Sequence, residues 1–201
     1  MTIDEPNTLG HNAAITPVNC LGGNDGAIDI TPFGGTLPYS YSWSGGEITE
    51  DVSGLTAGNY TITITDGKGC TDVVTHTVTE PPTAVNVTST ATEVSCYGGS
   101  DGSVDITTVG GTPGYTFSWV SDVGGFLPFT TEDINALPTG TYTVIATDNN
   151  GCKAQISQLV DQPVAPLSTT PVITNVLCFG DATGSVDPGI SGGTAPYTYV
   201  W

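Results

Sequence analysis

Alternating apolar and polar residues mark short stretches along most of the chain, and they predict β-strands. Residues 102–109 alternate in this way, and residues 60–65 and 142–147 are rich in β-branched side chains. Such stretches are typical of strands buried on one face, and the Gly, Asn and Asp clusters between them are typical of tight turns. No stretch has the 3.6-residue periodicity of an amphipathic helix. The pattern therefore predicts an all-β chain.

The strand pattern is repeated along the chain. The same motif begins at Cys20, Cys96 and Cys178, and each time it leads through a Gly-Gly-Thr turn to an aromatic strand that ends in tryptophan. A period of about 80 residues is that of a tandem array of small domains. About seven strands in each period predict immunoglobulin-like β-sandwich repeats. Short linkers with proline, such as Glu80–Pro82, predict that the repeats form an extended, semi-rigid rod.

The copies divide the chain into four segments. The predicted segments are the last strand of a preceding repeat (residues 1–10), repeat 1 (11–81), repeat 2 (82–163) and the first half of a third repeat (164–201). We expect the chain to be a piece of a longer array. The half repeat, whose aromatic face ends at Trp201, is expected to be disordered or to associate when it is isolated.

Aromatic residues recur on one face of a strand in each copy, and a tyrosine begins a later strand two residues after a glycine. We expect these side chains to form the core, with a surface platform for stacking sugars as the alternative. The later tyrosine is placed like the tyrosine corner of immunoglobulin-like sandwiches. The predicted core aromatics are Tyr39, Tyr41, Trp43, Tyr60, Tyr115, Phe117, Trp119 and Tyr142.

Repeat 2 contains an insertion that repeat 1 lacks. The distance in sequence from Trp119 to Thr131 exceeds that from Trp43 to Thr49 by the segment 123–128. Insertions are tolerated best in surface connections. We therefore predict a surface loop for this segment.

Charge narrows the choice of partners. The chain has 20 acidic residues against two lysines, Lys68 and Lys153, and a formal net charge of −18. This charge repels phosphate backbones and anionic lipid surfaces, so we expect no nucleic-acid partner. No apolar run is long enough for membrane insertion. The expected partners are neighbouring repeats of the same chain, and surface polysaccharide or further copies in a fibre.

The recurring motifs resemble the SprB-type repeat of Bacteroidetes surface proteins. The motifs are Cys-x-Gly-Gly-x-Asp-Gly-x-x-Asp-Ile, Gly-Gly-Thr, Thr-Glu-Asp-(Val/Ile)-x-x-Leu, Gly-x-Tyr-Thr-(Ile/Val) and Asp-x-x-Gly-Cys. The resemblance implies a PKD-like, immunoglobulin-like fold. It also implies giant proteins that are exported by the type IX secretion pathway and act at the cell surface in adhesion and gliding motility. The third copy departs from the pattern at Asp181–Thr183 and at Pro188.

The five cysteines indicate disulfides, because the chain lacks the Cys-x-x-Cys pairs that are typical of zinc sites. In an immunoglobulin-like strand order, Cys20, Cys96 and Cys178 follow the first strand, whereas Cys70 and Cys152 lie in the last hairpin, at the other end of the sandwich. We favour a bond between repeats, Cys20–Cys152, which leaves the other three cysteines to pair with repeats outside this sequence. The alternative is a bond within each repeat, Cys20–Cys70 and Cys96–Cys152.

We predict no cofactor, with calcium as the alternative that the clustered acidic side chains suggest. The candidate ligands are Asp25, Asp29, Asp101, Asp105 and Asp148, since calcium prefers oxygen ligands. No cofactor is required, because Asx and Gly turns use the same residues without a metal. An acidic surface also favours solubility.

Catalysis is not expected, because His11 and His76 have no counterpart in the other copies and so form no repeated catalytic or zinc site. We predict the repeat region of a large extracellular adhesin at the cell surface, forming a stiff stalk that carries disulfides. One alternative is a subunit of an extracellular structural filament. A carbohydrate-binding module beside an enzyme is a third possibility, which exposed Trp43 and Trp119 would favour.

Overall fold

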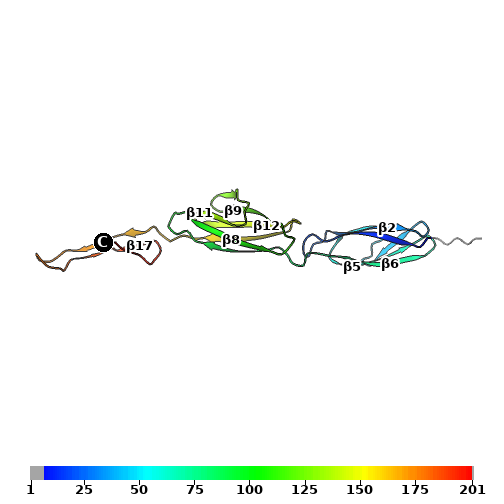
Figure 1. Ribbon diagram of the computed structural model, residues 1–201, viewed down its shortest axis with the longest axis horizontal. Coiled ribbons are helices and arrows are strands. Elements are labelled where there is room, and N and C mark those ends of the chain that lie inside the picture. Colours follow the sequence, from blue (N-terminus) through cyan, green and yellow to red (C-terminus); the bar gives the residue numbers. More distant parts are fainter. Residues whose placement is uncertain (1–6, 201) are drawn as a thin grey trace, which may run out of the picture. The chain divides into compact units, whose positions relative to one another are not determined.

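The structure is a computed structural model that describes residues 7–200, and it consists of antiparallel β-sheets (Figure 1). Among these residues there is no helix, and hence none that could span a membrane. Most of the predicted strand at residues 1–10 and the predicted aromatic at Trp201 lie outside the described residues.

The chain divides into two compact units. The first unit reaches to Val85 and also contains Gly110–Gly114 and Thr147–Cys152, and the second contains Asn86–Val109, Tyr115–Ala146 and the chain from Lys153 onward. Short turns of repeat 2 thus belong to the same unit as repeat 1.

Repeat 1 is a sandwich of two three-stranded sheets. One sheet has the order β1 (Gly10–Thr16), β2 (Gly26–Phe33), β4 (Val52–Leu55), and the other has the order β3 (Ser40–Trp43), β5 (Gly58–Thr65), β6 (Thr71–Val78). With the letters of their immunoglobulin counterparts, and with strand D missing between β3 and β4, these are the A-B-E and C-F-G sheets. The prediction of an immunoglobulin-like β-sandwich is confirmed.

The core of repeat 1 follows from the alternation of its strands. Ile28 of β2 and Ile62 and Ile64 of β5 point inward and are completely buried, and Trp43 packs with them. Intervening positions carry Thr or Asp and face outward. Burial of each isoleucine stabilises the sandwich by about 2 kcal/mol.

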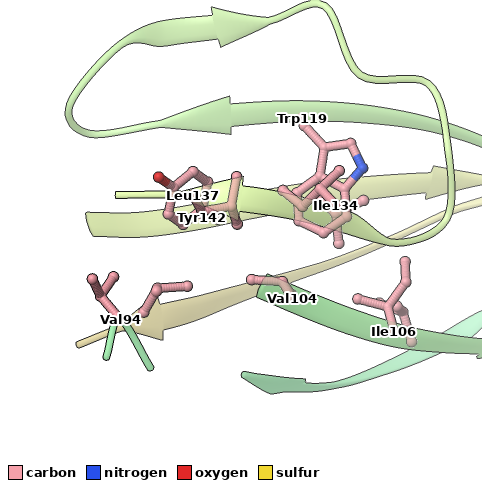
Figure 2. Close-up of a cluster of buried hydrophobic side chains, with 10 residues drawn as sticks. Val94, Val104, Ile106, Trp119, Ile134, Leu137 and Tyr142 are labelled. Atoms are coloured by element: carbon pink, nitrogen blue, oxygen red, sulfur yellow. The ribbon is translucent and has the colours of Figure 1, made fainter. Parts of the chain in front are cut away.

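Repeat 2 has the same strand order with one additional strand. One sheet contains β7 (Asn86–Thr92), β8 (Gly102–Val109) and β11 (Ile134–Leu137), and the other contains β10 (Gly125–Leu127), β9 (Thr116–Ser121), β12 (Gly140–Thr147) and β13 (Lys153–Val160). Figure 2 shows its core, in which Trp119 of β9 packs against Ile134 of β11 on the facing sheet, the sheet that also carries Val104 and Ile106 of β8.

The insertion in repeat 2 is the additional strand, so the prediction of a loop is wrong. Residues 122–124 form a turn, and β10 then pairs with β9 in an antiparallel register, with Leu127 opposite Trp119. The physical reason is that β9 would otherwise be an unpaired sheet edge, as β3 is in repeat 1. The turn and the short strand β10 give the backbone N–H and C=O groups of that edge hydrogen-bond partners.

The third repeat has only two small strand pairs in the described chain. Strand β14 (Ser168–Thr169) pairs with β17 (Ile190–Ser191), and β15 (Val172–Thr174) pairs with β16 (Ser185–Asp187). Val176 is 53% exposed, whereas Val94, its counterpart in repeat 2, is 2% exposed. The positions that form a core in repeat 2 are therefore open to solvent here.

Candidate functional site

The tryptophans that end the aromatic strands are structural. Trp43 is 4% exposed and Trp119 is 0% exposed. Their indole Nε1–H groups donate to the carbonyl oxygens of Thr49 (2.9 Å) and Thr131 (3.0 Å), which begin the Thr-Glu-Asp motifs. Buried rings cannot stack on a sugar, so this finding counts against a carbohydrate-binding module.

The other predicted core aromatics divide into two groups. The Tyr142 ring is buried, and Tyr39, Tyr41, Tyr60, Tyr115 and Phe117 are half-buried at the edge of the cores. Tyr60 Oη donates to the carbonyl of Thr56 (3.0 Å), and Tyr142 Oη donates to that of Pro138 (2.9 Å). Both bonds reach back along the chain as in a tyrosine corner. Burial raises the pKa of Tyr142, and the charge of Asp122 adds to this effect.

One disulfide joins cysteines of two repeats. Cys20 lies in the β1–β2 connection of repeat 1, and Cys152 lies in the β12–β13 hairpin of repeat 2. Their Cα atoms are 5.7 Å apart, a normal separation for a disulfide. Beside the bond, Asn150 Nδ2 donates to the carbonyl oxygen of Asn19 (3.1 Å). The residues around Cys152 belong to the same compact unit as Cys20.

A buried aspartate shapes the turn that presents Cys152. Asp148 Oδ1 accepts from the backbone N–H groups of Asn150 (2.9 Å) and Cys152 (2.8 Å), and Oδ2 accepts from Thr112 N (2.7 Å). Burial pushes the pKa of Asp148 upward, but these donors outweigh it and hold the pKa below its usual value. Asp66 makes the same turn in repeat 1, with donors from Thr36, Lys68 and Cys70.

A second aspartate shapes the loop that presents Cys20. Asp25 Oδ1 accepts from Asn19 N at 3.0 Å, and this bond lowers the pKa of Asp25. In repeat 2, the Ser95 hydroxyl and the Ser95 N–H both donate to Asp101 and lower its pKa in the same way. The Asp-Gly pair of the repeat motif is therefore explained by the shape of the loop.

The third copy keeps this loop with a different side chain. Thr183 stands where repeat 2 has Asp101, and its hydroxyl accepts from Leu177 N at 3.4 Å. The bond from Asp181 N to the carbonyl of Cys178 corresponds to the bond from Gly99 N to that of Cys96. A hydroxyl can thus replace the carboxylate, as expected of a loop-forming role.

The alternative pairing of cysteines within each repeat is wrong. Cys70, Cys96 and Cys178 are free and exposed. Cys20 follows β1, next to Glu80 at the end of β6, whereas Cys70 lies beside Leu9 and Gly35 at the start of the repeat. These ends are separated by strands of about eight residues, about 26 Å. A disulfide tolerates less than about 7 Å between Cα atoms.

The calcium candidates are not gathered into one cluster. Asp25, Asp101 and Asp148 accept the backbone N–H groups described above, whereas Asp29 and Asp105 lie exposed on the outer faces of β2 and β8. Within residues 7–200, no three His, Cys, Asp or Glu side chains are placed so that they could hold a metal ion. The Asx-turn alternative accounts for the positions of Asp25, Asp101 and Asp148.

The structure also joins three residues that were not predicted to act together. His11 of β1 contacts Asp72 and His76 of β6 through its two ring nitrogens. Reasoning from repeats dismissed both histidines because neither has a counterpart in another copy. The contacts link residues more than 60 positions apart, and no local motif signals them.

Comparison with protein families identifies these repeats. The model of the SprB repeat matches residues 12–47, 88–124 and 170–201, together more than half of the chain. The chain belongs to the SprB repeat family. SprB repeats belong to cell-surface proteins, and the disulfide fits an extracellular protein. Repeat and immunoglobulin-like families are generally structural rather than enzymatic. No curated protein matches the sequence.

Several solved structures match this chain in a structural comparison. The three N-terminal domains of the bacteriophage RB49 highly immunogenic outer capsid protein (Hoc) match with 14% identity and a TM-score of 0.48, covering 95% of this chain and 70% of that one. Murine CEACAM1b matches with 16% identity and a TM-score of 0.32, covering 77% and 100%. The IG1+IG2 domains of DIP-gamma match with 14% identity and a TM-score of 0.33, covering 77% and 96%. The fold assignment rests on the strand order of the repeats themselves.

Proposed function

We propose that this chain is the repeat region of a large extracellular adhesin, in which disulfides join consecutive sandwiches into a stiff stalk at the cell surface. The observation that carries the proposal is the Cys20–Cys152 bond, because it links the first loop of one repeat to the last hairpin of the next. Such a bond adds nothing to the core of either sandwich. It restricts how far the two repeats can separate when the stalk is pulled or bent.

The free cysteines extend this arrangement to further repeats. Cys96 and Cys178 correspond to Cys20, and Cys70 corresponds to Cys152. If they pair as Cys20 does with Cys152, Cys96 and Cys178 bond to the last hairpins of following repeats, and Cys70 bonds to the first loop of a preceding repeat. A cavity of about 380 Å³ beside Cys96 supports this pairing. It is lined by Gly193 and Thr194, the counterparts of the Gly111–Thr112 turn that supports Asp148.

Family resemblance suggests the biological setting. We place the stalk in a Bacteroidetes surface protein that is exported by the type IX pathway and serves attachment or gliding motility. Surface polysaccharide is the proposed partner of the whole adhesin, and the stalk is proposed to need no cofactor, with calcium as the alternative. The acidic surface of the stalk, with a formal net charge of −18, suits a solvated surface structure.

Non-reducing peptide mapping by mass spectrometry tests the disulfide rule. The protein should contain at least three complete repeats, so that each class of cysteine has its partner. We expect cross-links only between the first-loop cysteine of one repeat and the hairpin cysteine of the next. Cross-links within single repeats would overturn the stalk mechanism, because the domains would then be independent beads. Surface labelling of intact cells with an antibody to the repeats tests the location separately.

A further inference from the structure

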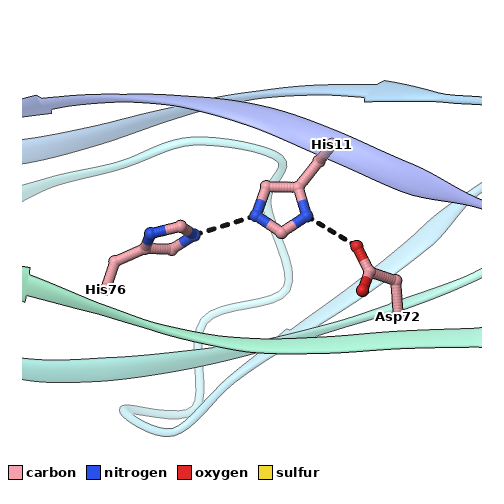
Figure 3. A network of polar contacts seen from close by, with 3 residues as sticks. All are labelled: His11, Asp72 and His76. Atoms are coloured by element: carbon pink, nitrogen blue, oxygen red, sulfur yellow. Dashed lines mark hydrogen bonds and ion pairs between the residues drawn. The ribbon is translucent and has the colours of Figure 1, made fainter.

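Repeat 1 contains a hydrogen-bonded chain of three titratable side chains that bridges its two sheets (Figure 3). His11 Nδ1 lies 2.6 Å from Asp72 Oδ2, and His11 Nε2 lies 2.9 Å from His76 Nε2. His11 projects from β1 and the other two side chains project from β6. These are edge strands of different sheets, so the side chains span a side of the sandwich that no backbone ladder closes.

The geometry assigns the protons at neutral pH. The carboxylate of Asp72 can only accept, so His11 donates from Nδ1 and presents the lone pair of Nε2. His76 then donates its Nε2–H to that lone pair. The side chain of His11 is only 4% exposed, so water cannot easily replace either partner. One added proton is accommodated, because a charged His11 can face Asp72 and donate to a neutral His76.

A second proton breaks the chain. When both imidazoles are charged, each Nε2 carries a hydrogen, and two donors face each other across 2.9 Å with no acceptor between them. We propose that His11, Asp72 and His76 form a proton-operated latch that holds the two sheets of repeat 1 together and releases them in acid. Release occurs when both imidazoles are protonated.

The surroundings of the pair support a latch. Burial holds the pKa of His76 below its usual value, and the charge of His11 acts in the same direction, against a smaller opposite effect of Asp72. From β5, the titratable neighbour is Tyr60, which lies directly opposite His76. From β2, the residue opposite His11 is Pro32, which carries no charge. Asp72 is thus the acidic group that faces the imidazoles.

The ring geometry favours a shared proton over a chelated metal. The ring centroids are 5.1 Å apart and the rings are nearly perpendicular, at 84°. With the two Nε2 atoms only 2.9 Å apart, the nitrogens point at each other almost in line. A metal ion placed in line between them would need about 4 Å, twice a metal–nitrogen bond of about 2 Å.

Repeat 2 provides an internal control. The counterparts of His11, Asp72 and His76 are Val87, Ala154 and Gln158, none of which titrates. Val87 and Ala154 pack in the core of repeat 2, and Gln158 accepts a bond from Ser89 Oγ at 2.8 Å. The same side of the sandwich is therefore closed by groups whose charge does not depend on pH.

Two measurements on the full chain test the latch. Long-range ¹H–¹⁵N NMR reports the protonation of each imidazole nitrogen, and the chain has only two histidines. We expect His11 to be the Nδ1–H tautomer at neutral pH and the two imidazoles to titrate as a coupled pair, so that each step changes the signals of both rings. Hydrogen exchange should show the β1 and β6 amides losing protection relative to β7 and β13 as the pH falls from 7 to 5, below the ordinary histidine pKa of about 6.5.

His76→Gln is the matched variant, because it introduces the residue of repeat 2. It should retain protection at pH 7 and abolish the selective loss in acid. Independent titration of the two histidines in the unmodified chain would overturn the latch, and this readout does not require any variant to fold. Stabilisation by added zinc or nickel ions that His76→Gln removes would also overturn it, in favour of a metal site.

Discussion

Gly54 and Ala136 occupy the same bulge in repeats 1 and 2, and both adopt a left-handed backbone, with φ of 72° and 57°. Left-handed φ is strained for a residue with a Cβ. A Cβ at Gly54 would meet only Asn24 O, at 3.9 Å, so backbone strain rather than crowding decides the outcome. We predict that Gly54→Ala destabilises repeat 1 by about 1 kcal/mol and that Ala136→Gly stabilises repeat 2 by about 0.5–1 kcal/mol.

Urea unfolding monitored by circular dichroism measures both changes. Ser53→Ala serves as the control, because Ser53 is an exposed neighbour on the same strand. Opposite signs for the two glycine–alanine exchanges are the expected signature of the bulge. Equal signs would mean that local packing outweighs the backbone conformation.

Asp66 and Asp148 make the stability of the chain sensitive to acid. Their backbone donors outweigh burial and lower both pKa values. The unfolded state therefore binds protons first, at about pH 3.9. Their contribution to stability is complete above that pH and is lost as the pH falls through the folded pKa values. The double variant Asp66→Asn/Asp148→Asn should be less stable at pH 7 and should show a flatter decline between pH 4 and pH 2.

Denaturant midpoints measured across this pH range test the prediction. Asp105→Asn is the control, because its exposed side chain on β8 lies away from both turns. If the double variant declined as steeply as the unmodified chain, other carboxylates would be responsible for the acid sensitivity.

Among the strands, β10 is an addition to a sandwich that folds without it. Repeat 1 lacks a counterpart of β10, and its core is nevertheless complete. Deletion of residues 123–128 should therefore leave repeat 2 folded. The loss of Leu127, which packs partly buried against the core, should cost about 1–2 kcal/mol. Tryptophan fluorescence of the folded state and its urea midpoint test both statements, and loss of the buried Trp119 signal would contradict them.

The strand order of each repeat could be predicted because every strand follows local rules. Alternation placed Ile28 and Ile62 inward, and Asp-x-x-Gly-Cys marked the last hairpin in each repeat. The insertion was misjudged because a strand of three residues has too little alternation to identify it. The inserted segment forms a strand because it pairs with the free edge of β9, and this edge exists only in the tertiary structure.

The histidine chain escaped prediction for a different reason. Comparison of copies finds what repeats share, whereas His11, Asp72 and His76 are where repeat 1 differs from repeat 2. Their positions on β1 and β6 become adjacent only when two sheets are stacked. Residues that depart from a repeat pattern therefore form contacts that the pattern does not predict.

Along the full chain, the disulfide decides which residues bear a pulling force. Cys20 and Cys152 are 132 positions apart. When the ends of the oxidised chain are pulled, tension passes through the sulfur–sulfur bond and bypasses everything between the two cysteines. Reduction should release up to roughly 450 Å of additional extension, at about 3.3–3.6 Å per residue. Single-molecule force spectroscopy measures this length directly.

Controls distinguish this bond from other thiol chemistry. Cys152→Ser without reductant should extend like the reduced chain, whereas Cys70→Ser should behave like the oxidised one, since Cys70 is free. Equal extension before and after reduction would mean that the bond does not form in solution.

The strands outside the disulfide loop must then fail first under force. Strand β1 precedes Cys20 and β13 follows Cys152, so each can be pulled away from its partner, β2 or β12, while the segment between the cysteines carries no tension. Strand β1 is also the strand that carries His11. Its link to β6 adds resistance on the side opposite β2 at neutral pH, and this resistance should fall in acid. At pH 5 the force needed to detach β1 should therefore fall in the unmodified chain and remain unchanged in His76→Gln.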